Sequence, residues 1–126
     1  MMKDFGRFEL HDKLGSGAMG SVFLGLQKAL DRRCVLKIIH EHLAEHREFV
    51  ERFQAEALGA ARLNHPNVVQ VIDFGEHEGR YFIAMEFAEG LDLKRWMDAY
   101  SQPPLEIAIL MLRELCAGLE HAHGRK

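Results

Sequence analysis

The chain has 126 residues, of which 48% are hydrophobic and 28% are charged, and its formal net charge is −3. This is the composition of one globular domain with its own core, and it argues against a disordered segment. A slightly acidic chain lacks the basic surface that nucleic acids need, so no nucleic-acid partner is expected. The polar N-terminus shows no apolar signal region, and no run approaches the ~18 apolar residues of a spanning helix, so we expect a cytoplasmic location and no membrane segment in this sequence.

Residues 8–14 predict the first strand, because Phe8, Leu10 and Leu14 fall on one alternating face. The glycine-rich segment 15–20 interrupts this alternation and residues 21–24 resume it, which predicts a hairpin with a glycine-rich tip. Residues 31–33 predict a turn. Residues 34–39 then predict a short strand that is apolar on both faces except at Lys37.

Between residues 47 and 63 the period becomes helical, with Phe49, Phe53, Ala60 and Leu63 on one stripe that also contains Glu56. The segment His-Pro-Asn at 65–67 ends this helix. Residues 68–74 and 81–87 predict two further strands, which are joined by a polar loop at 75–79.

The remaining sequence is helical in character. Residues 93–100 predict a short helix, and residues 101–104 predict a break followed by a helix start. A long helix is expected from 105 to about 121, and its apolar positions cover most of its circumference, which is typical of a buried helix. Strands with one inserted helix, followed by helices, favour an α+β fold with an antiparallel sheet.

The two cysteines, Cys34 and Cys116, lie far apart in apolar runs and have no C-x-x-C partner. We interpret them as buried, reduced thiols, which suits a reducing compartment.

Residues 15–22 read G-x-G-x-x-G-x-V. Glycines let a backbone turn tightly and approach a ligand, so that N–H groups point at phosphate oxygens. The match alone is weak, because glycine-rich hairpin tips are common. Two other phosphate loops fit worse: a Rossmann loop opens into a helix, whereas this one leads into a strand, and a Walker A loop needs Gly-Lys-Ser/Thr. A glycine loop between two strands is the arrangement of protein kinases.

Lys37 lies in an apolar strand and Glu56 on the inward stripe of the next helix. A buried charge is costly unless it is paired, so the sequence predicts that these two opposite charges meet. Such a pair would hold Lys37 toward an anionic phosphate. Taken singly, each residue has a plainer interpretation: Lys37 extends to water from a strand edge, or Glu56 swings out from the helix flank.

With these features in order, the chain resembles bacterial serine/threonine protein kinases of the eukaryotic-like type over essentially its whole length. Residues 15–22 resemble the loop that covers the nucleotide, residues 35–38 the lysine motif, and Glu56 the glutamate of the family's C helix. The segment 63–69, Leu-Asn-His-Pro-Asn-Val-Val, is similar to the connection after that helix and is the most specific match. Residues 81–87 resemble the strand that leads into the hinge, with Met85 at the gatekeeper position. Residues 105–123 resemble the helix that precedes the catalytic loop.

The resemblance implies a kinase N-lobe at 8–87, made of a five-stranded antiparallel sheet and one packed helix, a hinge at 88–92 and the start of the helical C-lobe at 93–126. It implies that Lys37 orients the α- and β-phosphates of ATP and that Glu56 fixes Lys37. The residues that it implies in ATP binding lie in the loop, the lysine strand and the hinge: Leu14, Gly15, Ser16, Gly17, Ala18, Met19, Gly20, Val22, Val35, Lys37, Met85, Glu86, Ala88 and Asp92.

Two positions depart from the family pattern. Val35 stands where alanine is usual, which would tighten the purine slot, and Cys34 replaces a common valine. The larger departure is that the H-R-D-x-x-x-x-N loop and the D-F-G motif are expected after the last helix, where this sequence stops. The catalytic aspartate and the Mg²⁺ ligands would then lie outside it, and this chain by itself is expected to be inactive.

The parent activity implied is transfer of the ATP γ-phosphoryl group to Ser or Thr of a protein. The alternative is a truncated or degenerate kinase that acts as a non-catalytic nucleotide-binding or interaction module. In either case, a helix at 105–121 without the rest of a helical lobe would expose apolar side chains, so self-association is expected.

Residues 42–46 also match H-x-x-E-H, an inverted zinc-protease motif. Zinc needs a third protein ligand, and none is apparent, so a polar connection is the favoured interpretation. His121 and His123 are two residues apart on a helix and are expected at the surface. Trp96 and Met97 are expected to pack within a short helix.

Overall fold

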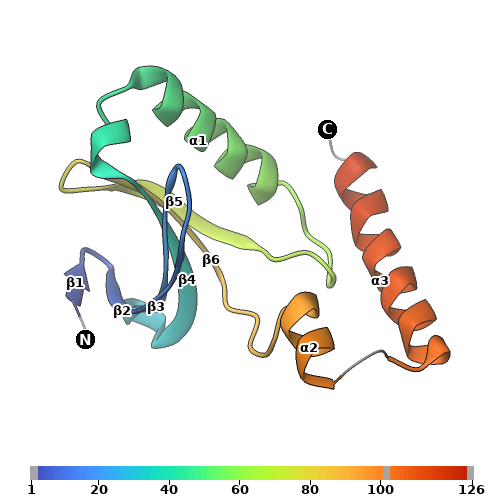
Figure 1. Ribbon diagram of the computed structural model, residues 1–126. Helices are drawn as coiled ribbons and strands as arrows, with labels where there is room; N and C mark the ends of the chain where they lie inside the picture. The colour runs from blue at the N-terminus through green and yellow to red at the C-terminus, as the bar shows by residue number, and fades with distance from the viewer. Residues whose placement is uncertain (1–2, 101–102, 125–126) are drawn as a thin grey trace.

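The computed structural model describes residues 3–100 and 103–124 of the chain. Six strands, three α-helices and two short 3₁₀ turns follow one another (Figure 1): β1 Lys3–Phe5, β2 Phe8–Ser16, β3 Gly20–Gln27, η1 Lys28–Leu30, β4 Arg32–Ile39, η2 Glu41–Leu43, α1 Arg47–Ala61, β5 Val71–His77, β6 Arg80–Glu86, α2 Leu93–Tyr100 and α3 Leu105–Gly124. The α+β class predicted from the sequence is confirmed.

All strands pair antiparallel in one sheet of order β1-β2-β3-β4-β6-β5. The prediction of five strands was short by one, because Lys3–Phe5 folds back on β2 and adds a strand at the edge. Gly6 makes this return with φ of 60°, a conformation that few residues other than glycine adopt readily. Three residues before a glycine are too few to show an alternating pattern, so β1 could not be predicted from the sequence.

The sheet curls until its first hairpin contacts its last strands. Phe5 and Phe8 both meet the Phe82 ring edge-on, at centroid separations of 5.5 and 5.4 Å. The Arg7 guanidinium also lies 2.8 Å from the Asp73 carboxylate of β5. These contacts join the two ends of the strand order, which gives the sheet the form of a half-barrel.

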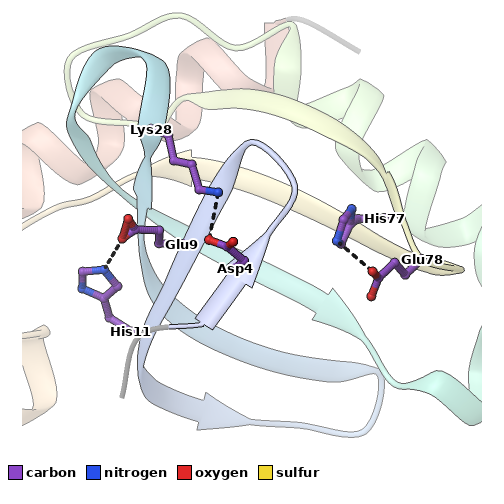
Figure 2. Close-up of polar contacts among 6 residues, drawn as sticks. All are labelled: Asp4, Glu9, His11, Lys28, His77 and Glu78. Atoms are coloured by element: carbon purple, nitrogen blue, oxygen red, sulfur yellow. Dashed lines mark ion pairs between the residues drawn. The ribbon is translucent and has the colours of Figure 1, made fainter.

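Three ion pairs on the surface of this curled region are drawn in Figure 2, and two of them lie near its edges. Lys28 pairs with Asp4 at 2.9 Å, and the His77 ring lies 3.8 Å from the Glu78 carboxylate. Pairs this exposed contribute roughly 0–1 kcal/mol each, so we assign the stability of the region to its apolar core.

Two apolar clusters occupy the two faces of the sheet. Inside the curl lie Phe5, Phe8, Leu10, Cys34, Leu36, Ile38, Phe82 and Ala84. On the other face, Ile39 and Ile83 pack against Phe53 and Ala57 of helix α1. Because side chains alternate along a strand, Cys34, Leu36 and Ile38 of β4 enter the first cluster, whereas Val35, Lys37 and Ile39 point to the opposite face, on which α1 packs. This alternation fixes which residues of β4 can share a site.

Several predicted boundaries shift. Helix α1 ends at Ala61 rather than at residue 63. The loop predicted at 75–79 is only a two-residue turn, in which Glu78 and Gly79 have φ of 51° and 79°. Two consecutive left-handed residues match the twist of the flanking strands, so the hairpin closes tightly. Leu14 is exposed rather than facing inward with Phe8, because bulges interrupt the β2–β3 pairing on both sides of Lys13.

Helix α3 stands beside the segment that connects α1 to β5 (Figure 1). The Asn67 side-chain amide donates to the Glu114 carbonyl and carboxylate at 2.9 and 2.7 Å. The Asn64 N–H donates to Nε2 of His121 at 3.0 Å. Gly118 is buried, and a Cβ there would lie 3.1 Å from the Asn67 carbonyl oxygen. A close backbone approach and polar contacts therefore attach α3 to the sheet region.

Helix α3 has the sequence pattern of a buried helix but, as expected without the rest of a helical lobe, only Gly118 is buried along its described residues. Its large apolar side chains, such as Leu105 and Leu112, are exposed. Cys116 is consequently exposed as well, whereas Cys34 is fully buried as expected. The break predicted at 101–104 lies partly outside the described residues. None of the described helices has the length and apolarity needed to cross a bilayer.

Candidate functional site

The register of the central strands gathers several predicted site residues on one face of the sheet. Lys37 lies directly opposite Val22 of β3, and Val35 lies opposite Met85 of β6. Directly opposed residues of an antiparallel pair point to the same face, and residues two apart on β4 do so too. Val22, Val35, Lys37 and Met85 therefore share the face that α1 covers in part. On this face, the cation Lys37 lies among the apolar residues Val22, Val35 and Met85.

Lys37 meets Glu56 of helix α1, as the sequence predicts. Its Nζ atom lies 3.3 Å from Oε1 of Glu56 and 6.0 Å from the centre of the Phe53 ring. The prediction that both charges are buried is wrong for Glu56, whose side chain is 52% exposed, against 28% for Lys37. Glu56 lies at the border of the apolar stripe, and Ala57, one residue later, takes the buried position. The pair is thus open to solvent on its carboxylate side.

The glycine-rich tip joins β2 to β3 through residues 17–19 and is closed by a hydrogen bond from the Gly17 N–H to the Gly20 carbonyl, 2.9 Å long. At Gly15 and Gly17, an added Cβ would meet nothing within 4 Å, so the backbone is open to a ligand there. At Gly20, a Cβ would lie 2.2 Å from the Ile38 carbonyl oxygen, so this glycine is required by the neighbouring strand. The motif therefore needs its glycines for different reasons: Gly15 and Gly17 leave the backbone open, and Gly20 lets β4 approach closely.

The other predicted loop residues are arranged around this tip. The hydroxyl oxygens of Ser16 and Ser21 lie 3.2 Å apart across its stem. Ala18 is exposed, whereas Met19 packs partly against the cluster beneath α1. Leu14 is 48% exposed on the strand that leads into the loop. His40, which the sequence did not single out, bonds to two carbonyls of the tip.

The predicted hinge, residues 88–92, follows shortly after the end of β6. The Glu86 N–H donates to the Gln70 carbonyl at 2.9 Å, so a ligand edge at this residue would have to use its carbonyl oxygen. Ala88 is exposed in the segment that follows. Arg33 braces this segment, since its guanidinium lies 5.0 Å from the centre of the Phe87 ring and 3.2 Å from the Glu89 carboxylate. This role of Arg33 was not predicted, because an arginine in a turn before a strand has the pattern of a solvated residue.

Asp92, the predicted ribose contact, caps helix α2. Its Oδ1 accepts the Arg95 N–H at 2.8 Å, and its carbonyl accepts the Trp96 N–H at 2.9 Å. Aspartate is among the best residues for this position because its side chain satisfies an otherwise unpaired N–H. A ribose contact by Asp92 remains a prediction.

The neighbouring aromatic residues of α2 are only partly packed. Trp96 is half-buried and contacts Tyr100, with ring centroids 6.0 Å apart. Met97 is exposed and lines an apolar cavity between α2 and α3.

The zinc alternative loses its geometric basis. His42 lies in the 3₁₀ turn η2, where its ring stacks on His40, and His46 immediately precedes α1, so the two do not share a helix face. Among residues 3–100 and 103–124, no group of three or more His, Cys, Asp or Glu side chains is arranged to hold a metal ion. His121, expected at the surface, is partly buried and bonded to the α1–β5 connection.

Two Asp-Phe-Gly triplets do occur in the chain, at residues 4–6 and 73–75. Neither lies where the family resemblance implies the metal-binding motif, which is after the helix at 105–123. Asp73 is paired with Arg7, and Phe74 packs toward Phe53. We therefore assign the second triplet to the packing of the half-barrel.

Cys34 lies on β4 next to the site face but points into the inner cluster. Burial raises the pKa of its thiol, and the charge of Arg32 acts more weakly in the opposite direction. A raised pKa keeps the sulfur protonated and a poor nucleophile, so Cys34 is a packing residue.

Comparison with known proteins places this geometry in context. The protein kinase domain family matches residues 8–126. The chain is 35% identical over 118 residues to the serine/threonine-protein kinase PrkC of Bacillus subtilis, covering 94% of this chain but 18% of PrkC. It is 38% identical over 120 residues to the serine/threonine-protein kinase pkn2 of Myxococcus xanthus, covering 95% of this chain and 14% of pkn2.

Solved structures agree in fold. The kinase domain of Mycobacterium tuberculosis PknI superposes with a TM-score of 0.76 at 32% identity, over 98% of this chain and 50% of the solved domain. The chain therefore spans about half of a kinase domain and less than a fifth of the two curated relatives.

Proposed function

The chain belongs to the protein kinase domain family, and from that premise we propose that it is the ATP-binding portion of a serine/threonine protein kinase. The observation that carries this proposal is the Lys37–Glu56 pair, 3.3 Å long, on the same sheet face as Val22, Val35 and Met85. An apolar surface suits a purine ring, and a cation held in place suits the phosphates beside it. The open backbone at Gly15 and Gly17 adds room for a close ligand.

In this proposal each part has a separate role. Lys37 contacts the α- and β-phosphates, and Glu56 keeps the lysine from turning away to water. The glycine tip covers the phosphates with its N–H groups, which favour anions. The Glu86 carbonyl and the backbone of Ala88 bind the adenine edge, and Val22, Val35 and Met85 contact its faces.

The reaction we propose for the whole kinase is transfer of the ATP γ-phosphoryl group to a Ser or Thr hydroxyl of a protein. In the family, Mg²⁺ neutralises charge on the phosphates and an aspartate accepts the hydroxyl proton. We propose that the residues for both roles follow residue 126. The part described here then contributes binding and orientation, and we expect it to transfer no phosphoryl group alone.

ATP-dependent thermal stability of the 126-residue chain tests the binding proposal. A ligand that binds only the folded state raises the melting temperature, and its effect grows with concentration. We expect ATP to raise the melting temperature of the wild type and to do so less in Lys37→Ala. Lys3→Ala, at an exposed lysine of β1, serves as the matched control and should respond like the wild type. A wild type that shows no ATP-dependent shift would remove the support for this function.

A non-catalytic nucleotide-binding or interaction module is the alternative. The coding sequence after residue 126 separates the two. An in-frame H-R-D motif followed by D-F-G favours the kinase, and a genuine stop codon at that point favours the module.

We also propose that copies of this chain associate through α3. Leu105, Ile109, Leu112 and Leu115 of this helix are each more than half exposed, at 72%, 55%, 59% and 54%. An apolar cavity of about 440 Å³ lies between α2 and α3. Apolar surface gathered in this way favours association in water.

Light scattering at micromolar concentration tests this association. The wild type should be larger than a monomer, and Leu112→Glu with Leu115→Glu should bring it to monomer size. Leu91→Glu is the control, because this exposed leucine precedes α2. A monomeric wild type contradicts the proposal.

A further inference from the structure

His40 makes two hydrogen bonds to the glycine-rich tip from the end of β4. Its backbone N–H donates to the Met19 carbonyl at 2.8 Å, and its Nε2 lies 2.8 Å from the Gly17 carbonyl oxygen. A carbonyl oxygen only accepts, so Nε2 must carry the proton in the second contact. Both the Nε2–H tautomer and the imidazolium meet this condition.

The bond to the Gly17 carbonyl fixes the direction of the next N–H group. A trans peptide unit is planar, and its C=O and N–H point in opposite directions. With the Gly17 oxygen held toward His40, the Ala18 N–H of the same unit points away from His40. The bond to Met19 holds a second carbonyl oxygen on the His40 side.

This orientation matters for an anion. Carbonyl oxygens repel a phosphate and N–H groups attract it, so a phosphate-binding tip must turn its oxygens aside. Nothing else in the tip fixes the Gly17–Ala18 peptide by packing, because Ala18 is exposed and the surroundings of Gly17 are open. Only the Gly17 N–H to Gly20 bond and the His40 contact restrain the tip at Gly17 among the bonds of the described residues.

The His40 ring is itself held in place. It stacks on the His42 ring with a centroid separation of 5.5 Å and an angle of 12° between the planes. His42 makes no hydrogen bond to the tip among those found in the described part of the chain. Its contribution to the tip is therefore only through the His40 ring.

We infer that His40 is a positioning residue of the phosphate site: it turns the Gly17 carbonyl away and presents the Ala18 N–H to the phosphates of a nucleotide. This inference rests on the proposed ATP-binding function. His40 itself needs no contact with the nucleotide and acts through the loop backbone.

Equilibrium binding of ATP and of adenosine to the 126-residue chain tests this role. In His40→Leu, ATP affinity should fall about fivefold, the effect of one lost hydrogen bond. Adenosine affinity should stay unchanged, because adenosine has no phosphates. His40→Gln places an amide donor near the former Nε2 and should restore ATP affinity to within about twofold of the wild type. His123→Leu, at an exposed histidine near the end of α3, is the matched control and should bind ATP like the wild type.

The possible outcomes distinguish the role of His40 from the ATP-binding function on which it rests. A wild type that binds neither ligand refutes ATP binding and the role of His40 together. If the wild type binds ATP and His40→Leu binds it equally well, His40 has no positioning role and ATP binding stands. An equal loss for ATP and adenosine, or no recovery in His40→Gln, assigns His40 to general stability and overturns the inference. A spectral change of the Ala18 amide on ATP addition, absent in His40→Leu, is the expected signature by nuclear magnetic resonance.

Discussion

The sheet with helix α1 and the pair of helices α2 and α3 both carry many apolar residues, but these residues have different surroundings. The first region buries side chains completely on both faces of its sheet, including Phe8, Leu36 and Phe53. Along α2 and α3, Gly118 is the only buried residue in the described part. The first region therefore supports its candidate site with its own core, whereas α2 and α3 need a further apolar surface to cover them.

Truncation of one apolar side chain in each region should give the largest difference in stability loss. Phe53→Ala removes a fully buried ring that packs near Phe74 and Lys37, and should lower the free energy of unfolding by about 3–5 kcal/mol. Leu112→Ala, at a side chain that is 59% exposed, should change it by about 0.5 kcal/mol or less. Urea denaturation measures both. Equal losses in the two variants would show that α3 is buried in solution and would break the comparison.

Substitution of the two kinds of glycine in the tip should give the second-largest difference in stability. Gly20→Ala places a methyl group against the backbone of Ile38 and should cost about 1–3 kcal/mol of unfolding free energy. Gly17→Ala, where the space is open, should leave stability nearly unchanged. Thermal denaturation without nucleotide measures the pair. A stable Gly20→Ala protein would mean that the tip does not lie against β4.

The attachment of α3 should show the smallest effect. Asn67→Ala removes two hydrogen bonds to Glu114 and should weaken docking by about 1 kcal/mol, because such contacts replace bonds to water. A helix of this length is marginal alone, so amide exchange over residues 105–124 should accelerate about fivefold.

The matched control for this attachment is Asn64→Ala. Asn64 contacts His121 through its backbone N–H, which the substitution keeps. Exchange in α3 that is equally fast in both variants, or unchanged in both, would show that the Asn67 amide does not hold the helix.

Local sequence patterns predicted the elements of the first region well. Alternating apolar residues and glycines located the central strands, and two charges in apolar surroundings predicted the Lys37–Glu56 contact. Periodicity located the stripe of α1 but not its border, so it assigned Glu56 to the inside, where Ala57 lies.

What failed depended on contacts that no local pattern contains. An apolar helix is buried only if something covers it, so Cys116 of the exposed helix α3 was wrongly assigned to the interior. His40 and Asn67 look like ordinary polar connection residues, and only the close approach of the tip and of α3 gives them partners. Strand β1 was missed for a simpler reason, namely its length of three residues.

The central claim is that Lys37 and Glu56 act as one unit in holding ATP. A double-mutant cycle on ATP affinity, measured by titration calorimetry on the 126-residue chain, tests it most directly. Lys37→Ala should weaken binding about tenfold or more, the range for a lost bond to a charged group. Glu56→Ala should weaken it less, about three- to fivefold, because its carboxylate is half exposed.

The double variant tests whether Glu56 acts only through Lys37. If Glu56 acts only through Lys37, then Lys37→Ala with Glu56→Ala should bind ATP as Lys37→Ala does alone, since the two losses are not independent. Losses that add in full, or a wild type that does not bind ATP, would contradict the account.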